Sequence, residues 1–289
     1  MGVTGAALDT AWSPDPGLLL SLSLLLGAYL VRWRRVRDRH GPAAASGWRM
    51  AAFAGGVAAL VAALVSPLDR MAEQLATLHM VQHLLLLDLA PILLLAGTTK
   101  ILLRPVTRAL VPVERAAGPL AHPAMGAIAY VGAMVAYHAP PVYDLTLRSD
   151  LAHVLAHMAL AGAGALYWWH LLSPARQRLR MGILGPVAYM AATKVGAGLV
   201  AIALGFAPEL IYDSYARLPE VWGLTHLEDQ RAAGLLMALE QSLVMGIALV
   251  ALFVRAMENA EQADRRTERL AQAQMVTRAH GNRAAHGRP

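Results

Sequence analysis

The chain has 289 residues, of which 57% are hydrophobic and only 15% are charged. A soluble chain carries about a quarter charged residues, so this composition excludes an ordinary soluble domain and indicates a membrane protein. Cysteine is absent, which excludes disulfides and thiolate metal sites and leaves histidine, methionine and carboxylates as metal ligands. The net charge is +6, and the basic residues lie in the connections between apolar blocks. This distribution is typical of membrane topology, so no nucleic-acid partner is expected.

Apolar blocks close to the roughly 20 residues needed to cross a bilayer predict seven transmembrane helices. In chain order they are Gly17–Val31, Met50–Val65, Leu75–Leu95, Met125–Tyr137, Leu151–Leu172, Leu184–Phe206 and Ala232–Phe253. The expected fold class is an all-α membrane protein in which residues 1–257 form a seven-transmembrane-helix bundle. The polar residues 258–289 are expected to form a cytoplasmic tail, partly helical or disordered.

Basic residues predict the orientation of this bundle. Arginine and lysine gather after the first, third and fifth blocks and in the tail, whereas the other connections are poor in them. The positive-inside rule then places the N-terminus outside and the C-terminus in the cytoplasm of a multi-pass protein of the plasma (inner) membrane. The segment Met1–Asp15 lacks a basic n-region, so the first block is expected to be an uncleaved helix.

Five of the eleven histidines fall in the outer half of the predicted bundle: His79, His83, His138, His153 and His157. The first two are four residues apart on the third helix, and the last two are four residues apart on the fifth. Each pair therefore lies on one helix face, one turn apart. Two such pairs on antiparallel neighbours can converge on a site of up to four imidazoles, which suits copper, zinc, iron or nickel.

Two other interpretations of these histidines remain open. A histidine in a membrane helix often makes an interhelical hydrogen bond, and histidines on facing helices can also ligate haem. The paired spacing favours a compact metal site, to which Met80 offers a soft sulfur ligand and Gln82 an orienting hydrogen bond.

Three ionisable residues lie deep in the predicted helices, where such groups are rare and usually functional or paired. An ion pair between Lys194 and Glu240 is the simplest expectation, and a proton or metal path through Asp88 and Glu240 is the alternative.

Several motifs resemble the seven-helix CtaG-like cytochrome c oxidase assembly factors. They are HMVQHLLL at residues 79–86, HAPPVYD at 138–144, HVLAH at 153–157 leading into Trp168-Trp169, and the stretch from Trp222 to Met237. The resemblance covers roughly Ser66 to Met237. The chain departs from the family pattern at Ala238 and at residues 240–242.

The resemblance implies a copper-related role in assembling the terminal oxidase, without enzymatic turnover. It implies copper as the bound metal, with the five histidines above as ligands and with Asp229 and Met237 as auxiliary groups. Haem binding by a membrane cytochrome or haem-handling protein is the alternative function. The expected partners are the lipid bilayer and oxidase subunits or copper chaperones, and a homo-oligomer is left open.

Overall fold

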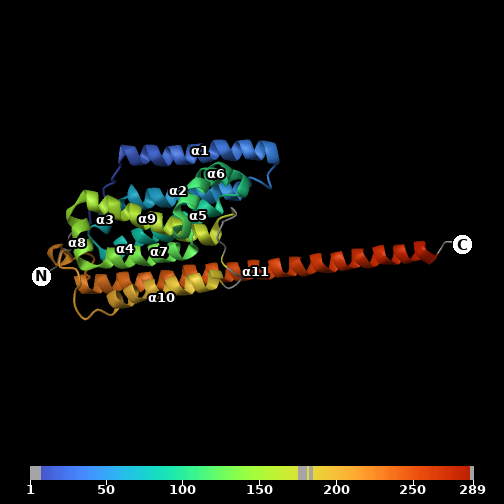
Figure 1. Ribbon diagram of the computed structural model, residues 1–289. Coiled ribbons are helices and arrows are strands. Elements are labelled where there is room, and N and C mark those ends of the chain that lie inside the picture. Colours follow the sequence, from blue (N-terminus) through green and yellow to red (C-terminus); the bar gives the residue numbers. More distant parts are fainter. Residues whose placement is uncertain (1–7, 175–180, 182–184, 287–289) are drawn as a thin grey trace. The chain divides into compact units, whose positions relative to one another are not determined.

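The computed structural model describes residues 8–174, 181 and 185–286, and every regular element within them is a helix (Figure 1). This confirms the all-α fold class. In chain order the helices are α1 (Pro16–His40), α2 (Gly47–Leu64), α3 (Pro67–Ala72), α4 (Ala76–Leu84), the π-helical turn η1 (Leu85–Leu89), α5 (Ala90–Ala96), α6 (Lys100–Ala117), the 3-10 turn η2 (Gly118–Ala121), α7 (Pro123–His138), α8 (Pro140–Arg148), α9 (Asp150–Leu172), α10 (Gly185–Gly205), the 3-10 turn η3 (Tyr215–Arg217) and α11 (His226–His286).

Six helical stretches are long and apolar enough to cross a membrane, which makes this a multi-pass membrane protein. They are α1, α2, the continuous stretch Ala76–Ala96, α9, α10 and residues His226–Arg269 of α11. A seventh span is reached when α6 with η2 is joined to α7, across a bend of 75°. The predicted span Met125–Tyr137 lies in α7, and the other six predicted spans lie within the six stretches or extend one residue beyond them. Val65, Leu75 and Phe206 each fall one residue outside the helix, and Leu184 falls outside the described residues.

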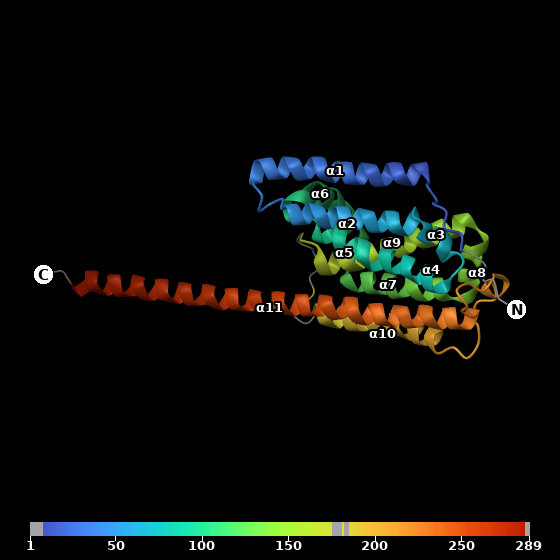
Figure 2. The ribbon, with the colours of Figure 1, turned by 180° about the vertical axis from the view of Figure 1, so that it is seen from behind.

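The chain divides into two compact units, Met1–Met245 and Gly246–Pro289. The first unit holds the helical bundle, in which α2 packs on α5, α7 on α9 and α10 on α7. Figures 1 and 2 both show α1 at the edge of this bundle, next to α2 and α6. Within the second unit, Arg265 donates to Glu261 one turn earlier, as on a solvated helix. The boundary at residue 257 stays a prediction.

The helix that carries two of the predicted ligands, α4, is fixed at its start by a distant residue. Asp229 on α11 accepts hydrogen bonds from the backbone nitrogens of Ala76 and Thr77 and from the Thr77 hydroxyl, at 2.6, 3.0 and 2.6 Å. These nitrogens have no partner within their own helix, and a negative charge is favourable at a helix N-terminus. Asp229 thus ties α4 to α11 at the end of the bundle nearest the histidines.

Below the histidines, α9 approaches η1 very closely at Gly164. A Cβ at this position would overlap the backbone carbonyl of Leu87. Because only a residue without a side chain lets two backbones come this close, Gly164 allows α9, which carries one histidine pair, to pack directly on η1, which follows α4.

Replacing Gly164 by valine is therefore expected to destabilise the bundle by about 1–3 kcal/mol or more through overpacking. Thermal unfolding of detergent-purified protein measures the loss. The control is Gly162→Val on the same helix, because a Cβ at Gly162 meets nothing within 4 Å. Equal stability of the two variants would contradict the close approach of α9 to η1.

Candidate metal centre

Three imidazoles from two helices meet inside the bundle. His79 and His83 on α4 are each 1% exposed, and His157 on α9 is 6% exposed. One ring nitrogen from each residue lies within 4.8 Å of those of the other two. The i,i+4 spacing on α4 places its two rings 4.4 Å apart, and the His157 ring lies 6.2 and 6.0 Å from them. We call these three residues the histidine centre.

The other two predicted histidines border this centre. His138, the last residue of α7, has its ring 5.9 Å from that of His83. The His153 ring lies 4.2 Å from that of His157 and 6.5 Å from that of His79, and His153 is half-buried. The structure therefore brings all five predicted residues together, with three at the core and two beside it.

Five buried ring nitrogens of this cluster have no hydrogen-bond partner among the described residues. They are His79 Nδ1, His83 Nδ1 and Nε2, His138 Nε2 and His157 Nε2. His138 Nδ1 lies 2.8 Å from the Met134 carbonyl oxygen and donates its hydrogen there, which leaves the lone pair on Nε2. Buried polar atoms without partners are rare and indicate a ligand that supplies the missing contacts. Several neutral imidazole nitrogens suit a transition-metal ion such as copper or zinc.

Tyrosines that were not among the predicted site residues lie against and beside the centre. Tyr137 Oη lies 2.8 Å from His79 Nε2, and the Tyr143 ring lies 5.3 Å from the His79 ring. Tyr143 donates to the Tyr215 hydroxyl at 2.7 Å, and Tyr212 donates to a backbone carbonyl at the end of α7 at 3.1 Å. Burial raises the pKa of Tyr143 and of Tyr215 above the ordinary tyrosine value, so these hydroxyls stay neutral donors.

The tyrosine nearest the centre orients one candidate ligand, His79. When hydrogen sits on His79 Nε2, the ring donates to Tyr137 and keeps a lone pair on Nδ1, the arrangement typical of metal-bound histidine. A hydroxyl inside an apolar helix, one residue before His138, was the sequence signal available for this role.

Replacing Tyr137 by phenylalanine is expected to weaken metal binding about 10- to 100-fold, because the ring of His79 loses its orienting partner. Competition titration against a chelator measures the affinity. The control is Tyr29→Phe, which removes another buried tyrosine hydrogen bond, to the Gly97 carbonyl, on α1. Unchanged affinity in the Tyr137 variant would show that His79 needs no such partner.

The predicted auxiliary residues have different positions. Met80 is buried and lines a small cavity of about 10 Å³ together with His79 and His138. Gln82 donates to the Ala63 carbonyl and to Asp69, both at 2.8 Å, so it ties α4 to α2 and α3 instead of contacting a histidine.

The two auxiliary residues on α11 are buried. Asp229 caps α4 as described above, and Met237 is fully buried.

A second polar cluster lies deeper in the bundle and centres on Asp88 of η1. Its carboxylate accepts hydrogen bonds from Trp168 Nε1 at 2.8 Å and from the Tyr130 hydroxyl at 2.9 Å. Gln241 donates to Tyr130, and Glu240 shares a side-chain hydrogen bond with Asp88.

This cluster corrects the expected ion pair between Lys194 and Glu240. Glu240 points to the carboxylate of Asp88 on another helix, whereas Lys194 is exposed on α10 and forms no ion pair with a described residue. Sequence position gave the two residues comparable depth but not the direction of either side chain.

The fold and the centre together define a multi-pass membrane protein with a buried, histidine-rich candidate metal site. The chain belongs to the cytochrome c oxidase caa3 assembly factor family (Caa3_CtaG), whose family model matches residues 27–259. The resemblance drawn from the histidine motifs is therefore confirmed. Neither a curated protein nor a solved structure matches the chain.

Proposed function

We propose that this assembly factor binds copper at the histidine centre and passes it to subunits of cytochrome c oxidase. The family supports oxidase assembly. The convergence of three buried histidines, with four of their ring nitrogens unpartnered, is the observation that supports metal binding.

The donor set favours copper over harder cations. Magnesium and calcium prefer oxygen ligands, whereas the centre offers imidazole nitrogens, and Met80 lines the small cavity beside His79 and His138. Imidazole and thioether ligands together suit Cu(I).

The half-buried His153 offers a path for transfer. Its ring is 4.2 Å from that of His157, so an ion can move by ligand exchange from the buried centre to the more exposed His153. Exchange of ligands makes and breaks no covalent bond of a substrate, and we infer a non-catalytic accessory role. We place the centre in the outer half of the plasma membrane, where oxidase subunits or copper chaperones can reach it from outside. The N-terminus then lies outside and the C-terminus lies in the cytoplasm.

Haem is the alternative cargo, and the geometry favours it less. A porphyrin needs a flat space of several hundred Å³, whereas the cavity beside His79 and His138 measures about 10 Å³. The convergence of three ring nitrogens also suits one ion better than two axial ligands on opposite faces of a ring.

Elemental analysis combined with an absorption spectrum of detergent-purified protein tests the proposal. We expect copper and no Soret band in the wild type and in His40→Ala, a control that removes an exposed histidine at the end of α1. A Soret band would show that the protein binds haem instead of copper. Protein that contains neither would refute metal binding.

A further inference from the structure

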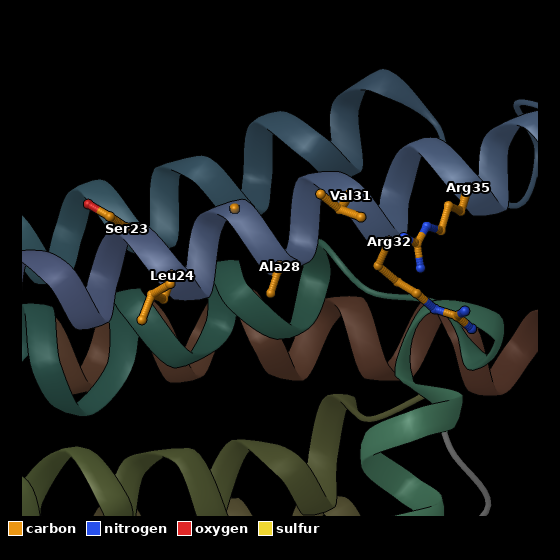
Figure 3. A pocket seen from close by; sticks show the side chains of 7 residues that line it. Ser23, Leu24, Ala28, Val31, Arg32 and Arg35 are labelled. Carbon is orange, nitrogen blue, oxygen red and sulfur yellow. The ribbon is translucent and has the colours of Figure 1, made fainter.

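A groove runs along α1, remote in sequence from the histidine centre, and holds about 500 Å³. We call it the α1 groove; Figure 3 shows its lining. It is lined by Ser23, Leu24, Gly27, Ala28, Val31, Arg32 and Arg35.

Most of the groove is apolar and uncovered by protein. Leu24 is 63% exposed and Val31 is 49% exposed, and a Cβ built at Gly27 meets nothing within 4 Å. From Leu24 to Arg32 the helix rises about 12 Å, which is close to half of the roughly 30 Å hydrocarbon thickness. The apolar part therefore matches the depth of one leaflet.

Two guanidinium groups close one end of the groove, as Figure 3 shows. Arg32 donates from Nη2 to the Ile101 carbonyl on α6 at 2.7 Å, while its buried Nε has no partner. Arg35 is exposed, and Lys100 begins the adjoining helix α6. Neither arginine forms an ion pair with a carboxylate in the part of the chain that the structure describes.

We propose that the α1 groove binds an anionic phospholipid. One acyl chain lies along Leu24, Ala28 and Val31, and the phosphate is held by Arg32 and Arg35. Arginine donors match phosphate oxygens in a fork geometry, and basic pockets at the membrane surface hold anionic headgroups. The unpartnered Nε of Arg32 supplies a donor that a phosphate oxygen satisfies.

Charge decides between a lipid and a partner helix. A second helix could pack against Ser23 and Gly27, but an apolar helix would leave both guanidinium groups at this end without a counter-charge. An anionic phospholipid fills the apolar part and neutralises the charged end with one molecule.

The test is native mass spectrometry of the full chain with phosphatidylglycerol or phosphatidylcholine supplied in equal amounts. We expect the wild type to retain phosphatidylglycerol preferentially. The double variant Arg32→Gln/Arg35→Gln should bind it about thirtyfold more weakly, since each basic group near the surface contributes about fivefold. Gly27→Leu, which fills the groove and keeps both arginines, should also reduce retention.

The matched control is Arg34→Gln/Arg39→Gln, which removes two exposed arginines from the same helix end outside the groove lining. Its lipid retention should equal that of the wild type. Equal loss in both double variants would show attraction by net charge alone and overturn the site. Equal retention of the two lipids, or a chain dimer that Gly27→Leu disrupts, would overturn it as well.

Discussion

Replacing His83 and His157 together by leucine is expected to abolish metal binding and to leave the metal-free protein as stable as the wild type or more stable. Both rings are buried, and three of their nitrogens have no partner. A buried polar group without a hydrogen bond costs about 1–3 kcal/mol. Its replacement by an apolar side chain removes this cost, while the centre loses two of its three ligands.

Competition titration with a Cu(I) chelator and thermal unfolding of the metal-free protein measure the two effects. The affinity should fall by more than about 100-fold, because loss of outer-shell partners alone costs 10- to 100-fold. His40→Leu, which changes an exposed histidine, should alter neither quantity. Metal-free protein destabilised by several kcal/mol would instead give His83 and His157 a structural role, and retained affinity would place the metal elsewhere.

Lost metal binding together with retained stability would separate the two interpretations that the sequence left open. A histidine that serves as an interhelical hydrogen-bond donor stabilises the fold, so its removal costs stability. A buried histidine whose role is to bind a metal ion lowers the stability of the metal-free protein, because its nitrogens lack partners until the ion binds. His83, with both nitrogens unpartnered, is the clearest example of the second kind.

The histidine centre could be predicted because it depends on local geometry. Four-residue spacing places His79 with His83 on one helix face whatever the rest of the chain does. The connections rich in arginine then gave both histidine pairs the same depth, and the structure brings them together.

Contacts between distant helices could not be predicted in the same way. Gln82, expected to orient a histidine by a hydrogen bond, donates to Ala63 of α2 and Asp69 of α3 instead, and Glu240 meets Asp88 and not Lys194. A sequence gives the depth of a side chain in the membrane, but the neighbouring helix decides which groups it meets.

The helix α6 lies where the sequence predicts only a connection rich in arginine and lysine. In the structure these residues form an amphipathic helix that contains Pro105 and Pro112, and with η2 and α7 it makes up the bent seventh candidate span. The basic residues that mark a connection between spans therefore do not exclude a helix.

Asp229 could either bind the metal itself or position the histidines that bind it, and substitutions at this residue distinguish the two roles. Its carboxylate accepts three hydrogen bonds at the start of α4, and it is 3% exposed. Because residues 76 and 229 are far apart in the sequence, no local sequence pattern could predict this helix cap. We interpret Asp229 as the group that sets the position of His79 and His83.

Replacing Asp229 by alanine should therefore destabilise the protein by about 2–4 kcal/mol, because the lost N-terminal cap and the buried donors left unsatisfied both contribute. Metal affinity should fall with it, since α4 carries two ligands of the centre. Asp229→Asn keeps an oxygen acceptor for the cap but removes the charge, so it should recover most of the stability and of the affinity. Asp213→Ala, an exposed aspartate in the preceding loop, is the control. Thermal unfolding and chelator competition measure both effects. A stable Asp229→Asn variant that still loses its metal would instead make the carboxylate a ligand.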